Sequence, residues 1–256
     1  MLASALIAGF AAGLLAALLH FAFVQELILL GEQYETGALT HFAAAPMMDA
    51  PPLTGTMTPD PTPDSTPNST IADHGHDHAS AHTHDGADTP ALTRNALTVL
   101  FAGLVYVAYG LILVAGFGLA EHFGKTTTAR TGLLWGIAGF ATFQLAPAMG
   151  LAPELPGTIA AELGARQFWW WGTVAATGTA LALLAYGRGV APLAVAALLL
   201  AAPHVIGAPQ PDAFWGAAPP EVAAAFSARV LGAGLAVWAV LGGLAGKLWH
   251  CNSKYM

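Results

Sequence analysis

Histidine and aspartate side chains are concentrated in one short tract of this sequence. From Asp73 to Asp85 the chain has five histidines and three aspartates within thirteen residues. Neutral imidazole is a good ligand for Co²⁺, Ni²⁺, Cu²⁺ and Zn²⁺, and a flexible His-x-His spacing lets two or three rings reach one ion. The tract therefore indicates a metal collector, with a solubilising His-rich linker as the alternative. The candidate ligands are His74, His76, His78, His82 and His84.

A second set of polar side chains lies in and just after the first apolar run. His20 lies deep in that run, and ionisable groups at membrane depth are costly, which makes each one a candidate functional residue. In a helix, Gln25, Glu32 and Glu35 would lie along one face, because their spacings are seven and three residues. We expect these carboxylates to receive a divalent cation; the alternative is that they are solvated charges at the membrane interface.

Two later segments combine proline with ionisable side chains. Pro153 and Pro156 bracket Glu154 and fix the backbone on either side of its carboxylate. His204 follows Pro203, where a break in the helix would free backbone carbonyls that must be buried or line a cavity. The alternative for Glu154 is a capped loop in which it lies near the start of the helix after Pro156. The alternative for His204 is a histidine that only packs against its neighbours. Two neighbouring residues are assigned to the same ion path: Gln144 and Arg166.

The composition limits the class of protein that carries these groups. Of the 256 residues, 55% are hydrophobic and 9% are charged, whereas soluble domains have about 25% charged residues. With 8 basic against 15 acidic residues and one cysteine, Cys251, the chain is neither a nucleic-acid binder nor a disulfide scaffold. It has no phosphate-binding loop, and no catalytic group or organic cofactor is expected. The sequence predicts an all-α, polytopic membrane protein in contact with lipid.

Six apolar runs are long enough, or nearly so, to cross a bilayer core of about 20 helical residues. The first has no preceding Lys or Arg and is too long for the apolar part of a signal peptide, so it is interpreted as a span. The runs are Leu2 to Leu30, Asn95 to Ala120, Thr131 to Met149, Gln167 to Tyr186, Val190 to Ile206 and Val222 to Leu248. The fifth is short, which would leave five spans. Small residues at four-residue spacing, such as Gly9/Gly13 and Gly132/Gly136, predict close packing between helices of this chain.

Basic residues predict the orientation, because they favour the cytoplasmic side. With six spans and a cytoplasmic N-terminus, five basic residues face inward and nearly all acidic residues face outward. Four parts follow: a first span with its polar end (1–36), a disordered Pro/Thr- and His-rich outward loop (37–93), the remaining spans (94–250) and a tail (251–256). The loop is expected to stay disordered because it has little apolar surface to bury.

Four stretches together resemble the CbtA family, predicted cobalt transporter subunits. They are Gln25 with Glu32 to Glu35, Leu145 to Gly157, Arg166 to Trp170, and Pro203 to Pro209. The resemblance covers nearly the whole chain except the Pro/Thr- and His-rich insert. It implies a bacterial inner-membrane subunit that works with a small single-span partner, CbtB, and supplies cobalt for cobalamin synthesis. The family is expected to have proline where this chain has Glu26, and it is commonly described with fewer than six spans.

The leading hypothesis is a Co²⁺ importer subunit in which the tract histidines concentrate the ion. Glu32, Glu35, Glu154 and His204 then form the entry site, with His20 and Gln25 further along the path. Nickel or zinc is the alternative substrate, because imidazole and carboxylate serve all three ions. Two other classes remain: a haem- or copper-binding redox protein with His20 and His204 as axial ligands, and an assembly subunit whose polar groups only join helices and bind a partner.

Overall fold

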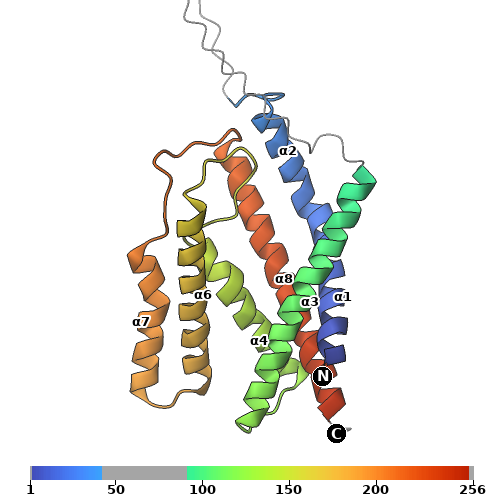
Figure 1. Cartoon of the computed structure of the whole chain (residues 1–256), viewed down its shortest axis with the longest axis vertical. Helices are drawn as coiled ribbons and strands as arrows, with labels where there is room; N and C mark the ends of the chain where they lie inside the picture. Colours follow the sequence, from blue (N-terminus) through green and yellow to red (C-terminus); the bar gives the residue numbers. More distant parts are fainter. Residues whose placement is uncertain (1, 42–90, 254–256) are drawn as a thin grey trace, which may run out of the picture. The chain divides into compact units, whose positions relative to one another are not determined.

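The computed structural model describes residues 2–41 and 91–253, which belong to one unit (Figure 1). The five tract histidines, most of the predicted outward loop and the end of the tail lie outside the described residues, so the predictions on them stay predictions. The elements are α1 (Leu2–Leu19), η1 (His20–Val24), α2 (Gln25–Glu35), α3 (Ala91–His122), α4 (Ala129–Phe140), η2 (Ala141–Leu145), α5 (Ala146–Ala148), α6 (Leu163–Tyr186), α7 (Val190–Ile206) and α8 (Pro220–Ser253). The two η elements are π-helical.

The described chain is helical, as predicted, because an apolar run in lipid can satisfy its backbone groups only internally. Four helices are long and apolar enough to cross a membrane: Leu2–Glu35, Ala91–His122, Leu163–Tyr186 and Pro220–Asn252. The other two predicted spans are also helical, over 129–148 (α4, η2 and α5) and over the 17 residues of α7. The bundle of apolar helices is confirmed, and the number of crossings stays a prediction.

Glycine brings two helix pairs into backbone contact. A Cβ atom on Gly9 would lie 2.5 Å from Val107 Cα, and one on Gly13 would lie 2.6 Å from Gly103 Cα, so α1 and α3 touch along their backbones. Gly132 and Gly136 of α4 meet the backbone of α8 in the same way. The prediction that the small-residue spacings serve packing within this chain is therefore confirmed.

Two apolar clusters hold the helices together. The larger one joins α1, α3, α4 and α8 and is built around Phe117, Trp238 and Leu241, all buried. The smaller one joins η1, α2, the loop after α5 and α8, and consists of Val24, Leu27, Leu155 and Phe226. Because α8 contributes to both clusters, it is the helix against which α1, α2, α3 and α4 are positioned, whereas α7 packs on α6.

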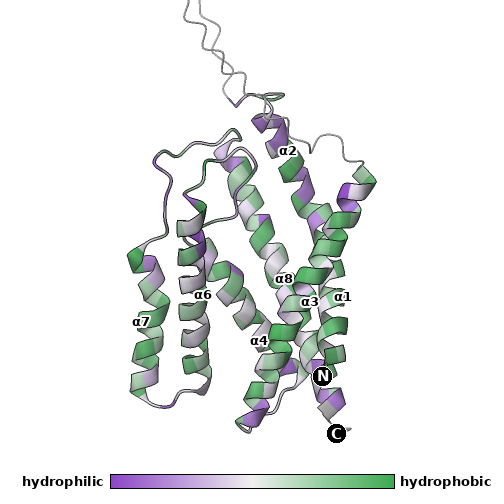
Figure 2. Ribbon diagram, viewed as in Figure 1, coloured by the Kyte–Doolittle hydropathy of each residue, from purple (hydrophilic) through white to green (hydrophobic). Residues whose placement is uncertain are grey.

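The polar segments gather at one end of this unit. Figure 1 shows the end of α2, the start of α3 and the loops 149–162 and 207–219 together, opposite the labelled N-terminus. In Figure 2 the end of α2 and the start of α3 are coloured as hydrophilic, while most of the helix length is hydrophobic. The two loops are joined by Ile159 N–H donating to Trp215 O at 3.0 Å and Ala217 N–H donating to Gly157 O at 3.2 Å. We call this the Glu154 end.

Candidate functional site

A pocket of about 650 Å³ lies at the Glu154 end, between η2–α5, the loop that follows, α6 and α8. Its lining is mostly apolar and aromatic, with a few polar side chains. The lining residues are Phe143, Gln144, Pro147, Ala148, Leu151, Ala152, Pro153, Glu154, Leu163, Arg166, Gln167, Trp170, Trp171, Val230 and Leu231. Three of the sequence-predicted residues, Gln144, Glu154 and Arg166, are thus brought together here.

The π-helical segment η2 positions Gln144. Pro147 follows two residues after this segment and has no N–H, so it cannot donate to the carbonyl of Phe143 as an α-helix requires. The side chain of Gln144 lies against Gly234 of α8, where an added Cβ would overlap with Gln144 Oε1. This buried oxygen has no hydrogen-bond partner among residues 2–41 and 91–253. Single π-turns in helices are frequent at functional sites, and an unsatisfied buried acceptor is costly.

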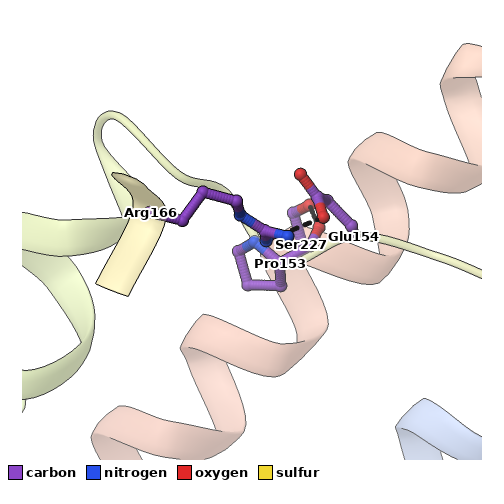
Figure 3. Close-up of polar contacts among 4 residues, drawn as sticks. All are labelled: Pro153, Glu154, Arg166 and Ser227. Carbon is purple, nitrogen blue, oxygen red and sulfur yellow. Dashed lines mark hydrogen bonds and ion pairs between the residues drawn. The ribbon is translucent and has the colours of Figure 1, made fainter. Parts of the chain in front are cut away.

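An ion pair holds Glu154 in the pocket wall. Arg166 Nη2 donates to Glu154 Oε2 at 2.9 Å, and the two side chains are 27% and 33% exposed (Figure 3). The loop is anchored on α8 beside this pair, because Ser227 Oγ–H donates to Pro153 O at 2.7 Å. The carboxylate is thus held, as the flanking prolines predict. Ser227 is not among the site residues predicted from the sequence, although it is the only hydroxyl residue between 220 and 250.

Another carboxylate, Glu162, caps the helix that carries Arg166. Glu162 Oε1 and Oε2 accept from the backbone N–H groups of Gly164 and Ala165 at 2.7 and 2.6 Å. These two hydrogen bonds favour the charged form and lower the pKa of Glu162 below its ordinary value. The alternative interpretation of Glu154 as a residue near a helix start is wrong, since α6 begins at Leu163 and its cap is Glu162.

The candidate residues of the first span lie on a different helix from the pocket. His20 begins η1 and is half-buried, as is Gln25 at the start of α2, while Glu32 and Glu35 are exposed. The end of α2 approaches the loop of Glu154, because a Cβ on Gly157 would lie 3.1 Å from Glu35 Cβ. Of Gln25, Glu32 and Glu35, Glu35 is therefore the residue that lies beside the loop of Glu154.

Glu26 lies close to the arginine of α8. Its Oε2 is 3.7 Å from Arg229 Nη1. The same Arg229 Nη1 donates to Phe23 O at 2.9 Å. Arg229 thereby satisfies a backbone carbonyl of the π-helical segment η1.

His204 lies in the last turn of α7 and does not line the pocket. Its ring packs on Trp169 of α6 with 6.3 Å between ring centroids, and Trp169 Nε1–H donates to Pro203 O at 3.2 Å. Within residues 2–41 and 91–253, no three His, Cys, Asp or Glu side chains are grouped so that they could hold a metal ion. Glu32, Glu154 and His204 therefore do not form one cluster here.

The arrangement offers a carboxylate, an amide and a guanidinium in a partly aromatic pocket within a bundle of apolar helices. Such a site can bind a ligand at the membrane surface, and it has no nucleophile–base pair among its lining residues. No curated protein and no solved structure matches this chain. Residues 1–250 match the model of the family described as probable cobalt transporter subunit (CbtA), and the chain therefore belongs to the CbtA family.

Proposed function

We propose that this chain collects Co²⁺ on the outer face of a bacterial inner membrane and passes it into the helix bundle, supplying cobalamin synthesis. Membership of a cobalt transporter subunit family gives the substrate and the transport role, and four apolar helices give a multi-pass membrane protein. We add the direction of transport, the residues of the ion path and the partner. The N-terminus of the chain is cytoplasmic, and the chain works with a small single-span subunit of the CbtB type.

The pocket at the Glu154 end is the observation that carries this proposal. Gln144, Glu154 and Arg166, which the sequence predicts as residues of the ion path, line the same pocket. Oxygen ligands such as the Glu154 carboxylate bind divalent ions. Entry of the ion requires Glu154 to exchange its Arg166 partner for the metal, because the two are paired at 2.9 Å.

The remaining candidates form the approach to this pocket. The tract histidines, His74, His76, His78, His82 and His84, raise the local concentration of the ion on the outer side. Glu32 and Glu35 then deliver it toward the loop of Glu154, which Glu35 approaches at Gly157. His204 contributes an imidazole ligand at the outer end of α7, and His20 and Gln25 lie further along the path.

Radiolabelled cobalt accumulation in cells that produce the full chain with its partner subunit tests the function. Glu154→Gln should lower accumulation strongly, and a variant lacking Glu32, Glu154 and His204 should abolish it. Glu26→Gln is the matched control, because Glu26 also pairs with an arginine but lies outside the pocket. Normal accumulation in the triple variant would refute the entry path.

Two further measurements define the substrate and its binding forms. Competition by Ni²⁺ and Zn²⁺ in the same assay separates cobalt from the alternative ions, since only the true substrate should displace the label at low concentration. Neutral imidazole and ionised carboxylate are the binding forms, so capture should weaken as the pH falls through about 6.5, the reference pKa of histidine. Cells that lack this chain should grow poorly, and added cobalamin should restore their growth. That result would link the transport activity to cobalamin synthesis.

A further inference from the structure

The pocket is several times larger than the ion that the proposed function sends through it. Six water molecules around a divalent ion occupy about 180 Å³, at about 30 Å³ for each water. The pocket measures about 650 Å³. An aquated ion would leave most of this space to be filled by something else.

The walls of the pocket have the composition of a site for a small organic molecule. Phe143, Trp170 and Trp171 supply aromatic surface, and Leu151, Leu163 and Leu231 supply aliphatic surface. A few polar groups stand among them, namely Gln144, Glu154, Arg166 and Gln167. Pockets of about 300–1,000 Å³ with this mixture bind organic ligands, which the apolar walls cover and the polar groups orient.

The protein ligands in the pocket are too few to hold a bare ion. Glu154 is the only His, Cys, Asp or Glu among the lining residues, and the described ranges 2–41 and 91–253 contain no group of three such residues suited to a metal. Divalent cobalt takes several N or O ligands. An ion bound at Glu154 must therefore bring most of its ligands with it.

The Glu154–Arg166 pair matches the charges of such a complex. A metal bound to a small organic carboxylate presents a positive centre and, beside it, negative carboxylate oxygens. The Glu154 carboxylate can take an open coordination position of the metal, while the Arg166 guanidinium pairs with a carboxylate of the carrier molecule. The 2.9 Å contact between the two residues is then replaced by two contacts of the same kind, and no charge is left unpaired.

We propose that this pocket binds divalent cobalt as a complex with a small organic di- or tricarboxylate, with Glu154 on the metal and Arg166 on the carboxylate. The aromatic walls cover the carbon skeleton of the carrier. Gln144 also lines the pocket, with its Oε1 buried against Gly234 of α8. This inference rests on the proposed function and specifies the form in which the ion enters.

Equilibrium binding to the purified full-length chain in lipid nanodiscs tests the inference with two labels. Radioactive cobalt is presented alone, and together with carbon-labelled citrate or malate. The expected result is that one of the two carboxylates binds to the chain, and does so only when cobalt is present. If neither carboxylate is bound in the presence of cobalt, the inference is refuted, because the pocket then takes no carrier.

Matched variants separate the two roles within the pair. Arg166→Gln should weaken binding of the labelled carboxylate about tenfold, the expected loss for one charge-assisted hydrogen bond. Glu154→Gln should lower binding of both labels. Arg229→Gln and Glu26→Gln, which alter the other arginine–glutamate pair, should leave both unchanged; equal loss in all four variants would refute the assignment.

The outcome is distinguishable from failure of the proposed function. A chain that binds no carboxylate, and whose cells accumulate cobalt without any carboxylate, keeps its transport function and loses only this inference. A chain whose cells accumulate no cobalt in either form loses the function itself. Monodisperse elution of each variant in size-exclusion chromatography confirms that the comparison is made on folded protein.

Discussion

The two π-helical segments have the same backbone irregularity but very different surroundings. Both η1 and η2 contact α8. At η1, Arg229 of α8 donates to the carbonyl of Phe23, and Val24 packs with Phe226 in the smaller apolar cluster. At η2, the side chain of Gln144 lies against Gly234, and the 650 Å³ pocket opens beside it.

The difference comes from the residues that α8 presents, since the backbone turn is the same in both places. Phe226, Val230 and Gly234 follow one another at four-residue spacing and therefore lie along one face of α8. Phe226 fills the space next to η1, Val230 touches both the smaller apolar cluster and the pocket, and Gly234 leaves room for an amide. α8 thus presents an aromatic ring beside η1 and, beside η2, a glycine that accommodates the Gln144 side chain.

The largest expected effect is on stability at the filled site. Phe226→Ala should lower the free energy of unfolding by about 3–5 kcal/mol, because it removes a buried aromatic side chain and leaves a cavity. Phe226 is 8% exposed, while Leu163 in the pocket wall is 63% exposed. Leu163→Ala should therefore change stability by less than about 1 kcal/mol. Unfolding in mixed detergent micelles measures both, and equal losses would show that the two regions are packed alike.

A smaller effect is expected on transport when the pocket side is altered. An alanine at Gly234 would overlap with Gln144 Oε1, and the end of this flexible side chain would move out of its place. Gly234→Ala should therefore reduce cobalt accumulation about severalfold, with stability changed by no more than about 1 kcal/mol. Gly232→Ala is the control, because nothing lies within 4 Å of a Cβ there.

If both glycine variants lose accumulation to the same extent at equal protein levels, the position of Gln144 is irrelevant to transport. If only Gly234→Ala loses it, the open π-turn at η2 is part of the path, in contrast to the filled one at η1. Both substitutions replace a glycine of α8 by alanine, but only the one at Gly234 places a methyl group against η2. The comparison therefore isolates that contact.

Much of the fold could be predicted from the sequence because lipid imposes a simple rule on apolar runs. Every run long enough to be considered a span is helical, and the Gly9/Gly13 and Gly132/Gly136 spacings are where helices meet. The π-turns were not predicted: Pro147 accompanies the one at η2, but no proline lies near the one at η1. The 17 residues of α7 are fewer than the about 20 that a helix needs to cross the bilayer core.

The site was predictable only in part. Prolines on both sides of Glu154 predict a held carboxylate, but nothing local in the sequence shows that Arg166, twelve residues later, would hold it. The helix break expected at Pro203 is wrong, since α7 continues through it to Ile206. The ring of His204 packs on Trp169 because α6 and α7 form a hairpin. Contacts set by tertiary packing, such as Ser227 with Pro153, leave no trace in the spacing of residues.

The smallest expected effect separates Glu162, the cap of α6, from Glu154 in the loop before it. Two backbone N–H groups hold the pKa of Glu162 below the ordinary carboxyl value of about 4.5, so the charged form stabilises the first turn of α6. This stabilisation is complete above the ordinary value and is lost as the pH falls through the lowered pKa. Comparing hydrogen exchange at Gly164 and Ala165 between the natural chain and Glu162→Ala should therefore show a protection difference at pH 7 that vanishes in strong acid.

Cobalt binding should be unaffected at pH 7, because Glu162 does not line the pocket. A loss of cobalt binding in this variant would mean that the pocket depends on the whole start of α6, in which case Glu154 and Arg166 could no longer be treated as a pair acting alone.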